Sequence, residues 1–232
     1  MAKMGLDRRE ALLGKAEDEA ATLRITECFA SIQGESTRAG VPTTFVRLTG
    51  CPLRCRWCDT AYAFSGGTRQ SIDEVLETVR LLGLPTVCVT GGEPLAQPAC
   101  RQLLTRLADG GFSVSLETSG AVSIAGIDPR VVVVMDLKAP GSGEVERNCW
   151  ANLAHLKPQD EIKIVLADRA DYEWAVAVVR NERLFERCTV LFSPVARELP
   201  PAELAEWIVA DRLPVRFQMQ WHKVLWGEAR GR

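Results

Sequence analysis

Short apolar runs rich in β-branched residues alternate along the chain with segments whose apolar residues recur at helical spacing. The runs are typical of buried strands and cover residues 43–50, 86–90, 112–117, 131–136, 189–192 and 215–220. The helical spacing predicts helices over residues 71–82, 172–180 and 201–210. Strands that alternate with helices through short links favour βα units and a parallel sheet.

Polar or glycine-containing motifs begin where several of these apolar strands end. They are Thr90-Gly91-Gly92-Glu93, Glu117-Thr118-Ser119, Asp136-Leu137-Lys138 and Ser193-Pro194. In a (β/α) barrel, functional residues collect at the carboxyl ends of the strands, so we expect these motifs to share one rim. Six or seven strands are fewer than the eight of a closed barrel. The pattern therefore predicts an α/β fold, a partial (β/α) barrel with mostly parallel strands.

The length of the chain indicates one domain. Its 232 residues are enough for one sizeable hydrophobic core. Residues 1–22 mix acidic and basic side chains with only a weak apolar patch. We therefore predict a poorly ordered N-terminal extension over residues 1–22 and a core domain over residues 23–232.

Charge and composition narrow the class of protein. The formal net charge of −2 provides no basic excess that would indicate nucleic acid or a membrane surface as a partner. No apolar run approaches the roughly 20 residues of a membrane-spanning helix, and the polar, charged N-terminus does not resemble a secretory signal. Eight cysteines without an export signal favour a reducing cytoplasm over a disulfide framework.

Three cysteines follow the strand over residues 43–50 within one short loop. Cys51, Cys55 and Cys58 form a Cys-x3-Cys-x2-Cys pattern. Thiolates are soft ligands that suit zinc, copper(I) or iron–sulfur clusters. A structural zinc ion takes four protein ligands, and His155 and His222 are too distant in sequence to complete a local site. Three thiolates can instead hold three corners of a [4Fe–4S] cluster and leave the fourth iron open to a small molecule.

This spacing, followed by the Thr90-Gly91-Gly92-Glu93 motif, resembles the radical S-adenosylmethionine (SAM) superfamily. The resemblance implies a partial barrel in which Cys51, Cys55 and Cys58 hold a [4Fe–4S] cluster. It also implies that SAM binds the open iron and is reductively cleaved to a 5′-deoxyadenosyl radical. The positions that the resemblance assigns to the cofactor are Trp57, Cys58, Asp59, Gly92, Asp136, Leu137, Lys138 and Ser193.

A narrower resemblance rests on three further features. Ile32-Gln33-Gly34-Glu35, Arg47 and Cys58-Asp59-Thr60 occur in the order found in the 7-carboxy-7-deazaguanine synthase family, and the likeness runs from about Leu23 to Trp226. It implies a lyase that converts 6-carboxy-5,6,7,8-tetrahydropterin to 7-carboxy-7-deazaguanine with loss of ammonia. The product belongs to queuosine or other deazapurine biosynthesis.

The chemistry of this substrate agrees with the residues that the resemblance assigns to it. A guanidinium binds a carboxylate through two parallel hydrogen bonds, which suits Arg47. An amide both donates and accepts, which suits Gln33 at the edge of a pterin ring. The complete set expected for the substrate is Ile32, Gln33, Gly34, Arg47, Thr90 and Glu117.

The same resemblance implies further partners. Thr60 is expected to bind Mg²⁺ together with the substrate, since magnesium takes oxygen ligands. A flavodoxin or ferredoxin is expected to supply the electron, and the family resemblance implies a homodimer. The C-terminal segment departs from the family pattern, because Trp221 stands before His222 where threonine is common, so no substrate contact is assigned to it.

Two alternatives remain open from the sequence. The first is an activase that makes a glycyl radical on another protein. The second is a non-enzymatic iron–sulfur or zinc module, which needs a fourth protein ligand such as Cys28 or Cys88. Otherwise we expect the isolated cysteines to behave as small buried apolar residues and both histidines to be structural.

Overall fold

The computed structural model describes residues 21–231, in which nine strands form one mixed sheet. The strands are β1 (Thr22–Ile32), β2 (Pro42–Leu48), β3 (Thr68–Ser71), β4 (Thr86–Gly91), β5 (Ser113–Thr118), β6 (Val132–Lys138), β7 (Glu161–Leu166), β8 (Thr189–Pro194) and β9 (Arg216–Phe217). Their order is β3-β1-β2-β4-β5-β6-β7-β8-β9. All pairings from β2 to β9 are parallel, whereas β1 pairs antiparallel with β2 and β3. The predicted α/β fold with mostly parallel strands is confirmed.

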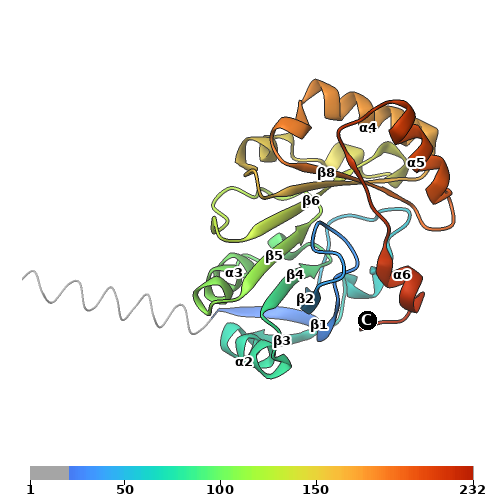
Figure 1. Ribbon diagram of the computed structural model, residues 1–232. Coiled ribbons are helices and arrows are strands. Elements are labelled where there is room, and N and C mark those ends of the chain that lie inside the picture. The colour runs from blue at the N-terminus through green and yellow to red at the C-terminus, as the bar shows by residue number, and fades with distance from the viewer. Residues whose placement is uncertain (1–20, 232) are drawn as a thin grey trace, which may run out of the picture.

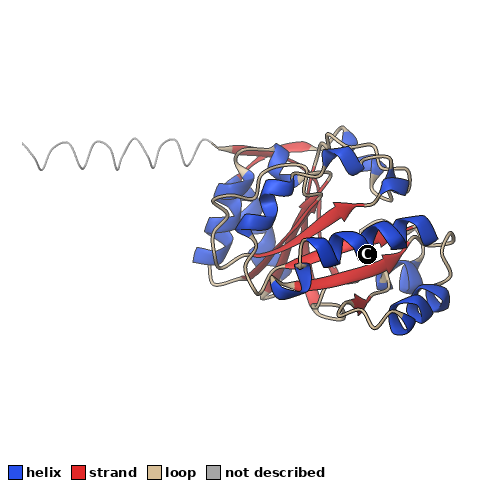
Figure 2. Ribbon diagram, turned by 90° about the horizontal axis from the view of Figure 1, so that it is seen from above, coloured by secondary structure: helices blue, strands red, loops and turns tan. Residues whose placement is uncertain are grey.

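Within the described residues, the four long α-helices cover the outer face of the curved sheet, whereas the short C-terminal helix borders the cavity. The α-helices are α2 (Ile72–Leu82), α3 (Cys100–Asp109), α4 (Arg169–Asn181), α5 (Pro201–Ala210) and α6 (Trp221–Trp226). The 3₁₀ helices are η1 (Ala61–Phe64), η2 (Pro94–Ala96), η3 (Pro140–Ser142), η4 (Val145–Arg147), η5 (Trp150–His155) and η6 (Leu184–Glu186). Helices α2 and α3 lie near the N-terminal strands and α4 and α5 near β8 (Figure 1), and the strands occupy the middle of the molecule (Figure 2).

Local sequence explains where these helices begin and end. Ser71 and Glu74 form a reciprocal capping box at the start of α2. Helix α2 ends at Gly83, whose φ of 72° lies in the left-handed region that glycine adopts without strain. Helix α5 begins at Pro201. Proline lacks a backbone N–H, but the N–H at the first position of a helix has no acceptor within the helix, so no hydrogen bond is lost there.

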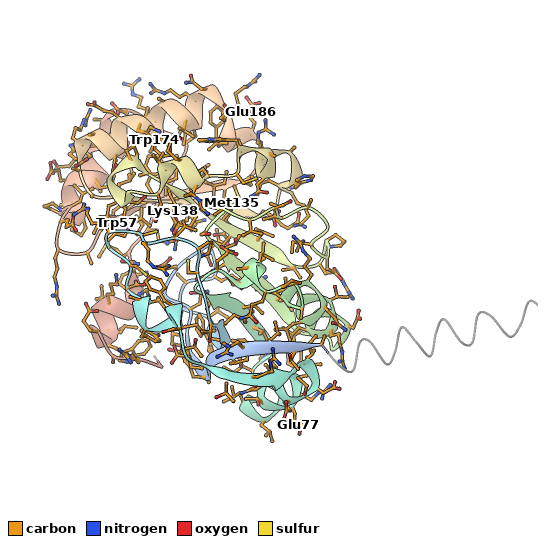
Figure 3. All side chains as sticks on the ribbon, turned by 180° about the vertical axis from the view of Figure 1, so that it is seen from behind. Trp57, Glu77, Met135, Lys138, Trp174 and Glu186 are labelled. Atoms are coloured by element: carbon orange, nitrogen blue, oxygen red, sulfur yellow. The ribbon has the colours of Figure 1, made fainter. Side chains whose placement is uncertain are left out.

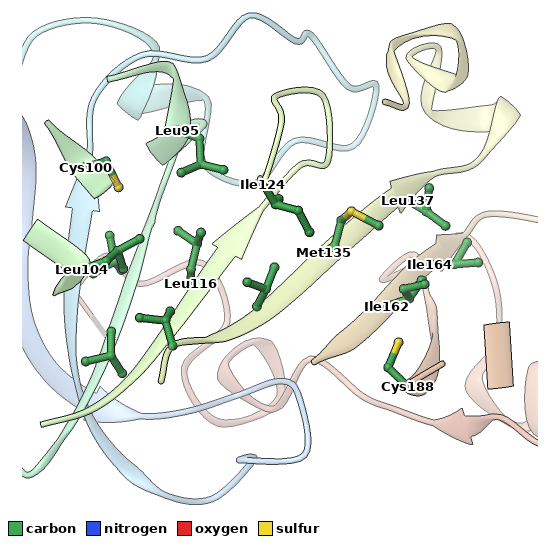
Figure 4. Close-up of a cluster of buried hydrophobic side chains, with 14 of the residues drawn as sticks. Leu95, Cys100, Leu104, Leu116, Ile124, Met135, Leu137, Ile162, Ile164 and Cys188 are labelled. Atoms are coloured by element: carbon green, nitrogen blue, oxygen red, sulfur yellow. The ribbon is translucent and has the colours of Figure 1, made fainter. Parts of the chain in front are cut away.

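Successive residues of the parallel strands point to opposite faces of the sheet. On β6, Met135 and Leu137 are buried in the hydrophobic core beneath the helices, whereas Asp136 and Lys138 face the inside of the barrel. Figure 4 shows Met135 and Leu137 within this core, beside side chains from the neighbouring strands and from α3. The period of two therefore places apolar packing on one face and polar chemistry on the other.

The structure differs from the sequence-based prediction in one strand, contains two elements that were not predicted, and leaves most of the predicted N-terminal extension untested. The strand predicted over residues 215–220 pairs only at Arg216 and Phe217, because the following residues turn away to contact the loop after β1. The sequence did not predict β3 or α6. Residues 1–20 of the predicted extension lie outside the described residues, and Thr22 already belongs to β1, opposite Ser71.

Among residues 21–231, none of the helices is both long and apolar enough to cross a lipid bilayer.

Candidate active site

A cavity of about 470 Å³ opens at the carboxyl ends of the parallel strands. All of the site residues that the sequence predicted line it except two, Leu137 and Ser193. The side chain of Leu137 packs into the outer core. Ser193 lies opposite Val165, which lines the cavity. The hydroxyl group of Ser193 is fully buried and has no hydrogen-bond partner among the described residues.

The cysteine loop is seated directly on the glycine-rich turn after β4. Gly50 has a φ of 98° and starts the loop, and its carbonyl accepts a hydrogen bond of 2.8 Å from the Glu93 amide. A Cβ atom at position 92 would lie 1.9 Å from the Gly50 carbonyl oxygen. Gly92 is therefore required for backbone packing, independently of any contact that it makes with a cofactor.

Three thiols from one loop, Cys51, Cys55 and Cys58, line the cavity and provide a set of soft ligands. Burial raises the pKa of Cys51 and of Cys55, and the positive charge of Lys138 partly opposes this shift. In the part of the chain that the structure describes, no three Cys, His, Asp or Glu side chains gather closely enough for one metal ion. Three thiolates can hold three corners of a cubane cluster, whereas a structural zinc ion takes four protein ligands. This donor set fits a [4Fe–4S] cluster.

One end of the cavity combines an aromatic ring with paired charges. Trp57 packs against an inner cluster that includes Val165 and Val195, and Figure 3 shows Trp57 and Lys138 towards the middle of the molecule. Lys138 Nζ lies 3.1 Å from Asp136 Oδ2. The other oxygen, Oδ1, is buried and has no partner among residues 21–231. A buried carboxylate oxygen without a donor is costly, so it fits a hydrogen-bond donor from a bound cofactor.

The other end of the cavity holds a rigid guanidinium. Arg47 Nε forms an ion pair of 2.7 Å with Glu27, and the rings of Phe29 and Tyr62 each lie 5.9 Å from the guanidinium carbon. Tyr62 also donates to Glu27 at 2.7 Å, and burial together with Glu27 raises its pKa to about 12. Arg47 is therefore held in place by an ion pair through one nitrogen and by two neighbouring aromatic rings.

Three predicted substrate residues from separate strands and loops meet beside Arg47. Gln33 Nε2 donates to Glu117 Oε1 at 3.1 Å, and the Thr90 hydroxyl donates to Glu117 Oε2 at 3.4 Å. Thr90 is also the register partner of Arg47 across the β2–β4 pairing. The sequence placed these side chains at strand ends and in a loop, and the fold brings them into one polar group.

Sequence reasoning missed the ion pair between Glu35 and Lys163. Lys163 Nζ binds Glu35 Oε2 and lies 3.5 Å from Asp136 Oδ2. A signal was present, because Lys163 interrupts the apolar run of β7. That signal could not name the partners, since Glu35 is 128 residues away in sequence.

The C-terminal segment closes over the cavity and brings in further unpredicted residues. The Trp221 amide donates to the Gly34 carbonyl at 3.0 Å, and the side chain of His222, interpreted from sequence as structural, lines the cavity. Lys223 Nζ lies 3.0 Å from Asp59 Oδ2. Burial alone would raise the pKa of Asp59, but His222, Lys223 and Thr60 outweigh it and hold that pKa far below its usual range.

Comparison with known proteins identifies the family. Residues 45–130 match the model of the radical SAM superfamily. The 7-carboxy-7-deazaguanine synthase of Chlorobaculum tepidum is 48% identical over 215 residues, which cover 91% of this chain and 98% of that protein. The enzyme of the same name from Koribacter versatilis is 43% identical over 223 residues, covering 88% and 97%. The chain belongs to the 7-carboxy-7-deazaguanine synthase family.

The fold agrees with this membership. The crystal structure of QueE from Escherichia coli superimposes with a TM-score of 0.71 at 24% identity and covers 86% of this chain and 94% of that one. The protein is thus a radical SAM enzyme with the partial-barrel fold of its family. Membership in this superfamily supports the [4Fe–4S] cluster and SAM as its cofactors.

Replacing Gly92 by alanine tests the packing of the cysteine loop. Because the new Cβ would overlap the Gly50 carbonyl, we expect the free energy of unfolding to fall by about 1–3 kcal/mol. Iron incorporated during anaerobic reconstitution should fall as well. In the control Gly110→Ala, φ is −74° and the nearest atoms are 3.3 Å away, so a shift of a few tenths of an ångström accommodates the new methyl group and both quantities should fall much less than in Gly92→Ala. Normal iron content and stability in Gly92→Ala would contradict the predicted overlap.

The Glu35–Lys163 pair predicts a particular dependence of stability on pH. Burial alone would raise the pKa of Glu35, but Lys163, His222 and Gln220 lower it below its ordinary 4.5. Burial alone would lower the pKa of Lys163, but Glu35 and Asp136 raise it well above 10.5. The stabilisation is therefore complete between about pH 4.5 and 10.5. It is lost as pH falls below that range through Glu35, and as pH rises above it through Lys163.

Urea unfolding of Glu35→Gln measures this contribution. At pH 7 the variant should be about 2 kcal/mol less stable than the parent, since it loses a charged hydrogen bond. At pH 3.5 the difference should shrink, because Glu35 of the unfolded parent binds a proton below its ordinary pKa of 4.5 and the lowered pKa of the folded state then contributes less stability. The control Glu77→Gln, on the exposed surface of α2, should match the parent at both pH values. An equal loss of stability for Glu35→Gln at pH 7 and pH 3.5 would rule out the pair as its source.

Proposed function

We propose that this protein converts 6-carboxy-5,6,7,8-tetrahydropterin to 7-carboxy-7-deazaguanine with loss of ammonia, the carbon–nitrogen lyase step of queuosine or related deazapurine biosynthesis. The observation that carries the proposal is the single cavity that joins the cysteine loop to the group around Arg47. Family membership supports the same reaction, since both relatives described above carry the name of this synthase.

The cofactor end of the cavity would be formed by residues of the cysteine loop and of β6. Cys51, Cys55 and Cys58 would hold the cluster, and Asp136 and Lys138 would face SAM. Trp57, Asp59 and Gly92 would complete its surroundings, with Leu137 contributing only backbone and Ser193 lying beneath the surface of the cavity. When bound, the cluster and SAM supply the radical chemistry, and the protein supplies placement and electrostatics.

The substrate end would recognise a carboxylate and a ring edge with both donors and acceptors. Arg47 would hold the substrate carboxylate through its two Nη atoms, since the ion pair with Glu27 uses Nε. Gln33, Thr90 and Glu117 would read the pterin edge, with the backbone of residues 32–34 beside them. The partly buried ion pair and the two neighbouring rings would fix the guanidinium before substrate arrives, which reduces the entropy lost on binding.

A magnesium site at Thr60 belongs to the same proposal. The Thr60 hydroxyl donates its proton to Asp59 Oδ1 at 2.8 Å, which leaves the oxygen lone pairs available to a cation. Magnesium takes oxygen ligands and keeps several waters, so one hydroxyl plus substrate oxygens and water is a suitable set. Magnesium bound there would orient the substrate and stabilise negative charge.

The remaining partners follow from the family resemblance. They are an electron donor of the flavodoxin or ferredoxin type and a second copy of the chain in a homodimer. A cytoplasmic location agrees with free, reduced cysteines.

Substitution of Arg47 tests the substrate assignment by calorimetry on the reconstituted enzyme. Arg47→Lys keeps a positive charge but loses the two-pronged geometry, so pterin affinity should fall by roughly 10- to 100-fold (about 1.5–3 kcal/mol). SAM affinity should stay unchanged. The control Arg80→Lys on the exposed face of α2 should bind both ligands normally. Unaltered pterin binding in Arg47→Lys would remove Arg47 from the site. A parent protein that binds SAM but no pterin would favour the glycyl-radical activase.

Substitution of Thr60 tests the magnesium site. Thr60→Ala removes the hydroxyl, so the Mg²⁺ concentration for half-maximal activity should rise at least about 10-fold, the scale of losing even an outer-shell ligand partner. Thr60→Ser keeps the hydroxyl and should retain the response of the parent. The measurement is a magnesium titration of product formation. The site at Thr60 is excluded if the alanine and serine variants show the same titration curve as the parent.

A further inference from the structure

Lys163 lies between the two ends of the cavity. It is on the inner face of β7, directly opposite Asp136 in the β6–β7 pairing. Its ammonium group binds Glu35 Oε2, from the loop after β1, and lies 3.5 Å from Asp136 Oδ2. One charge thus contacts a carboxylate from each half of the site.

The surroundings of Lys163 hold this arrangement in the charged form. The side chains of Lys163, Glu35 and Asp136 are 11%, 9% and 16% exposed, so water screens their charges little. Lys138 contacts the same oxygen of Asp136, Oδ2, at 3.1 Å and balances the second carboxylate. His222 and Glu117 are further titratable groups that face Glu35 and Lys163, and Cys55 faces Asp136 and Lys138. Two ammonium groups and two carboxylates therefore form one buried network whose members cannot move independently.

Each carboxylate that Lys163 contacts is tied to a different ligand region. Glu35 follows Gln33 and Gly34, the predicted substrate segment, and its Oε1 accepts a hydrogen bond of 2.8 Å from Gln220. Asp136 ends β6 in the predicted SAM region, and its Oδ1 is the buried oxygen without a partner in the described part of the chain. A donor that binds Oδ1 would fix the carboxylate that Lys163 contacts.

We propose that Lys163 is a positioning residue that couples SAM binding to substrate binding. SAM bound at Asp136 would restrict the ammonium of Lys163, which would in turn hold Glu35 and the preceding Gln33–Gly34 segment in the orientation that receives the pterin. The coupling is reciprocal, so bound pterin strengthens SAM binding by the same factor. This inference rests on the proposed function, because it requires both ligands in one cavity.

Calorimetry on the reconstituted enzyme tests the coupling. The SAM dissociation constant is measured with and without saturating 6-carboxy-5,6,7,8-tetrahydropterin, under reducing conditions without an electron source strong enough to start the reaction. In the parent protein the pterin should tighten SAM binding by at least about 5-fold, the lower end of typical coupling factors. In the double variant E35Q/K163Q this ratio should fall to about 1.

The double variant is chosen because it removes one positive and one negative charge together. Asp136 keeps Lys138 as a partner, so no buried charge is left alone. The single variant Glu35→Gln provides a second measurement, since it cuts only the link to the substrate loop. It should also bring the ratio to about 1, while SAM affinity without pterin stays within about 2-fold of the parent. The control Lys157→Met breaks a comparable ion pair with buried Asp160 outside the cavity and should keep the full ratio.

The outcomes separate the inference from the proposed function. A parent protein that binds no pterin overturns both. Binding of both ligands with a ratio of about 1 in the parent overturns the inference alone. So does an unchanged ratio in E35Q/K163Q, even when its stability or its separate affinities fall, because that pattern indicates a purely structural ion pair. A ratio lost in both variants and kept in Lys157→Met supports the coupling.

Discussion

The two-residue alternation of the parallel strands is the constraint on which the rest of the molecule depends. On β6, Met135 and Leu137 anchor the strand beneath the outer helices, and this packing forces Asp136 and Lys138 into the cavity. A one-residue slip would reverse both faces, exposing apolar groups in the cavity and burying charges under helices. The cost of that exchange fixes the register, and the register fixes which charged groups meet.

Loops from distant parts of the chain complete the cavity at the carboxyl ends of the strands. The cysteine loop rests on Gly92, where a side chain would occupy the space of the Gly50 carbonyl. In the C-terminal segment, the Trp221 amide and the Gln220 side chain bind the loop that contains Gly34 and Glu35. A direct backbone hydrogen bond contributes to each closure, from the Glu93 amide to the Gly50 carbonyl and from the Trp221 amide to the Gly34 carbonyl.

The sequence predicted much of the fold because strand and helix periodicity is local, and it predicted the candidate site from that pattern together with the resemblance of its motifs to a known family. Strand periodicity and the motifs after each strand anticipated the shared rim, including Asp136 and Gly92. Contacts between residues that are far apart in the sequence could not be predicted. Periodicity assigns a residue to one face of the sheet, but it does not identify the residue opposite it on the next strand. The contact between Glu35 and Lys163 is one case, and the turn that ends the last strand after Phe217 is another.

Product formation is the most direct test that this fold carries out the proposed reaction. The protein is reconstituted without oxygen and supplied with SAM, Mg²⁺, a reductant and 6-carboxy-5,6,7,8-tetrahydropterin, and the products are analysed by mass spectrometry. We expect 7-carboxy-7-deazaguanine and ammonia from the parent and neither from variants with alanine at Cys51, Cys55 or Cys58. Release of 5′-deoxyadenosine without 7-carboxy-7-deazaguanine, from parent protein with a full cluster, would contradict the assigned substrate.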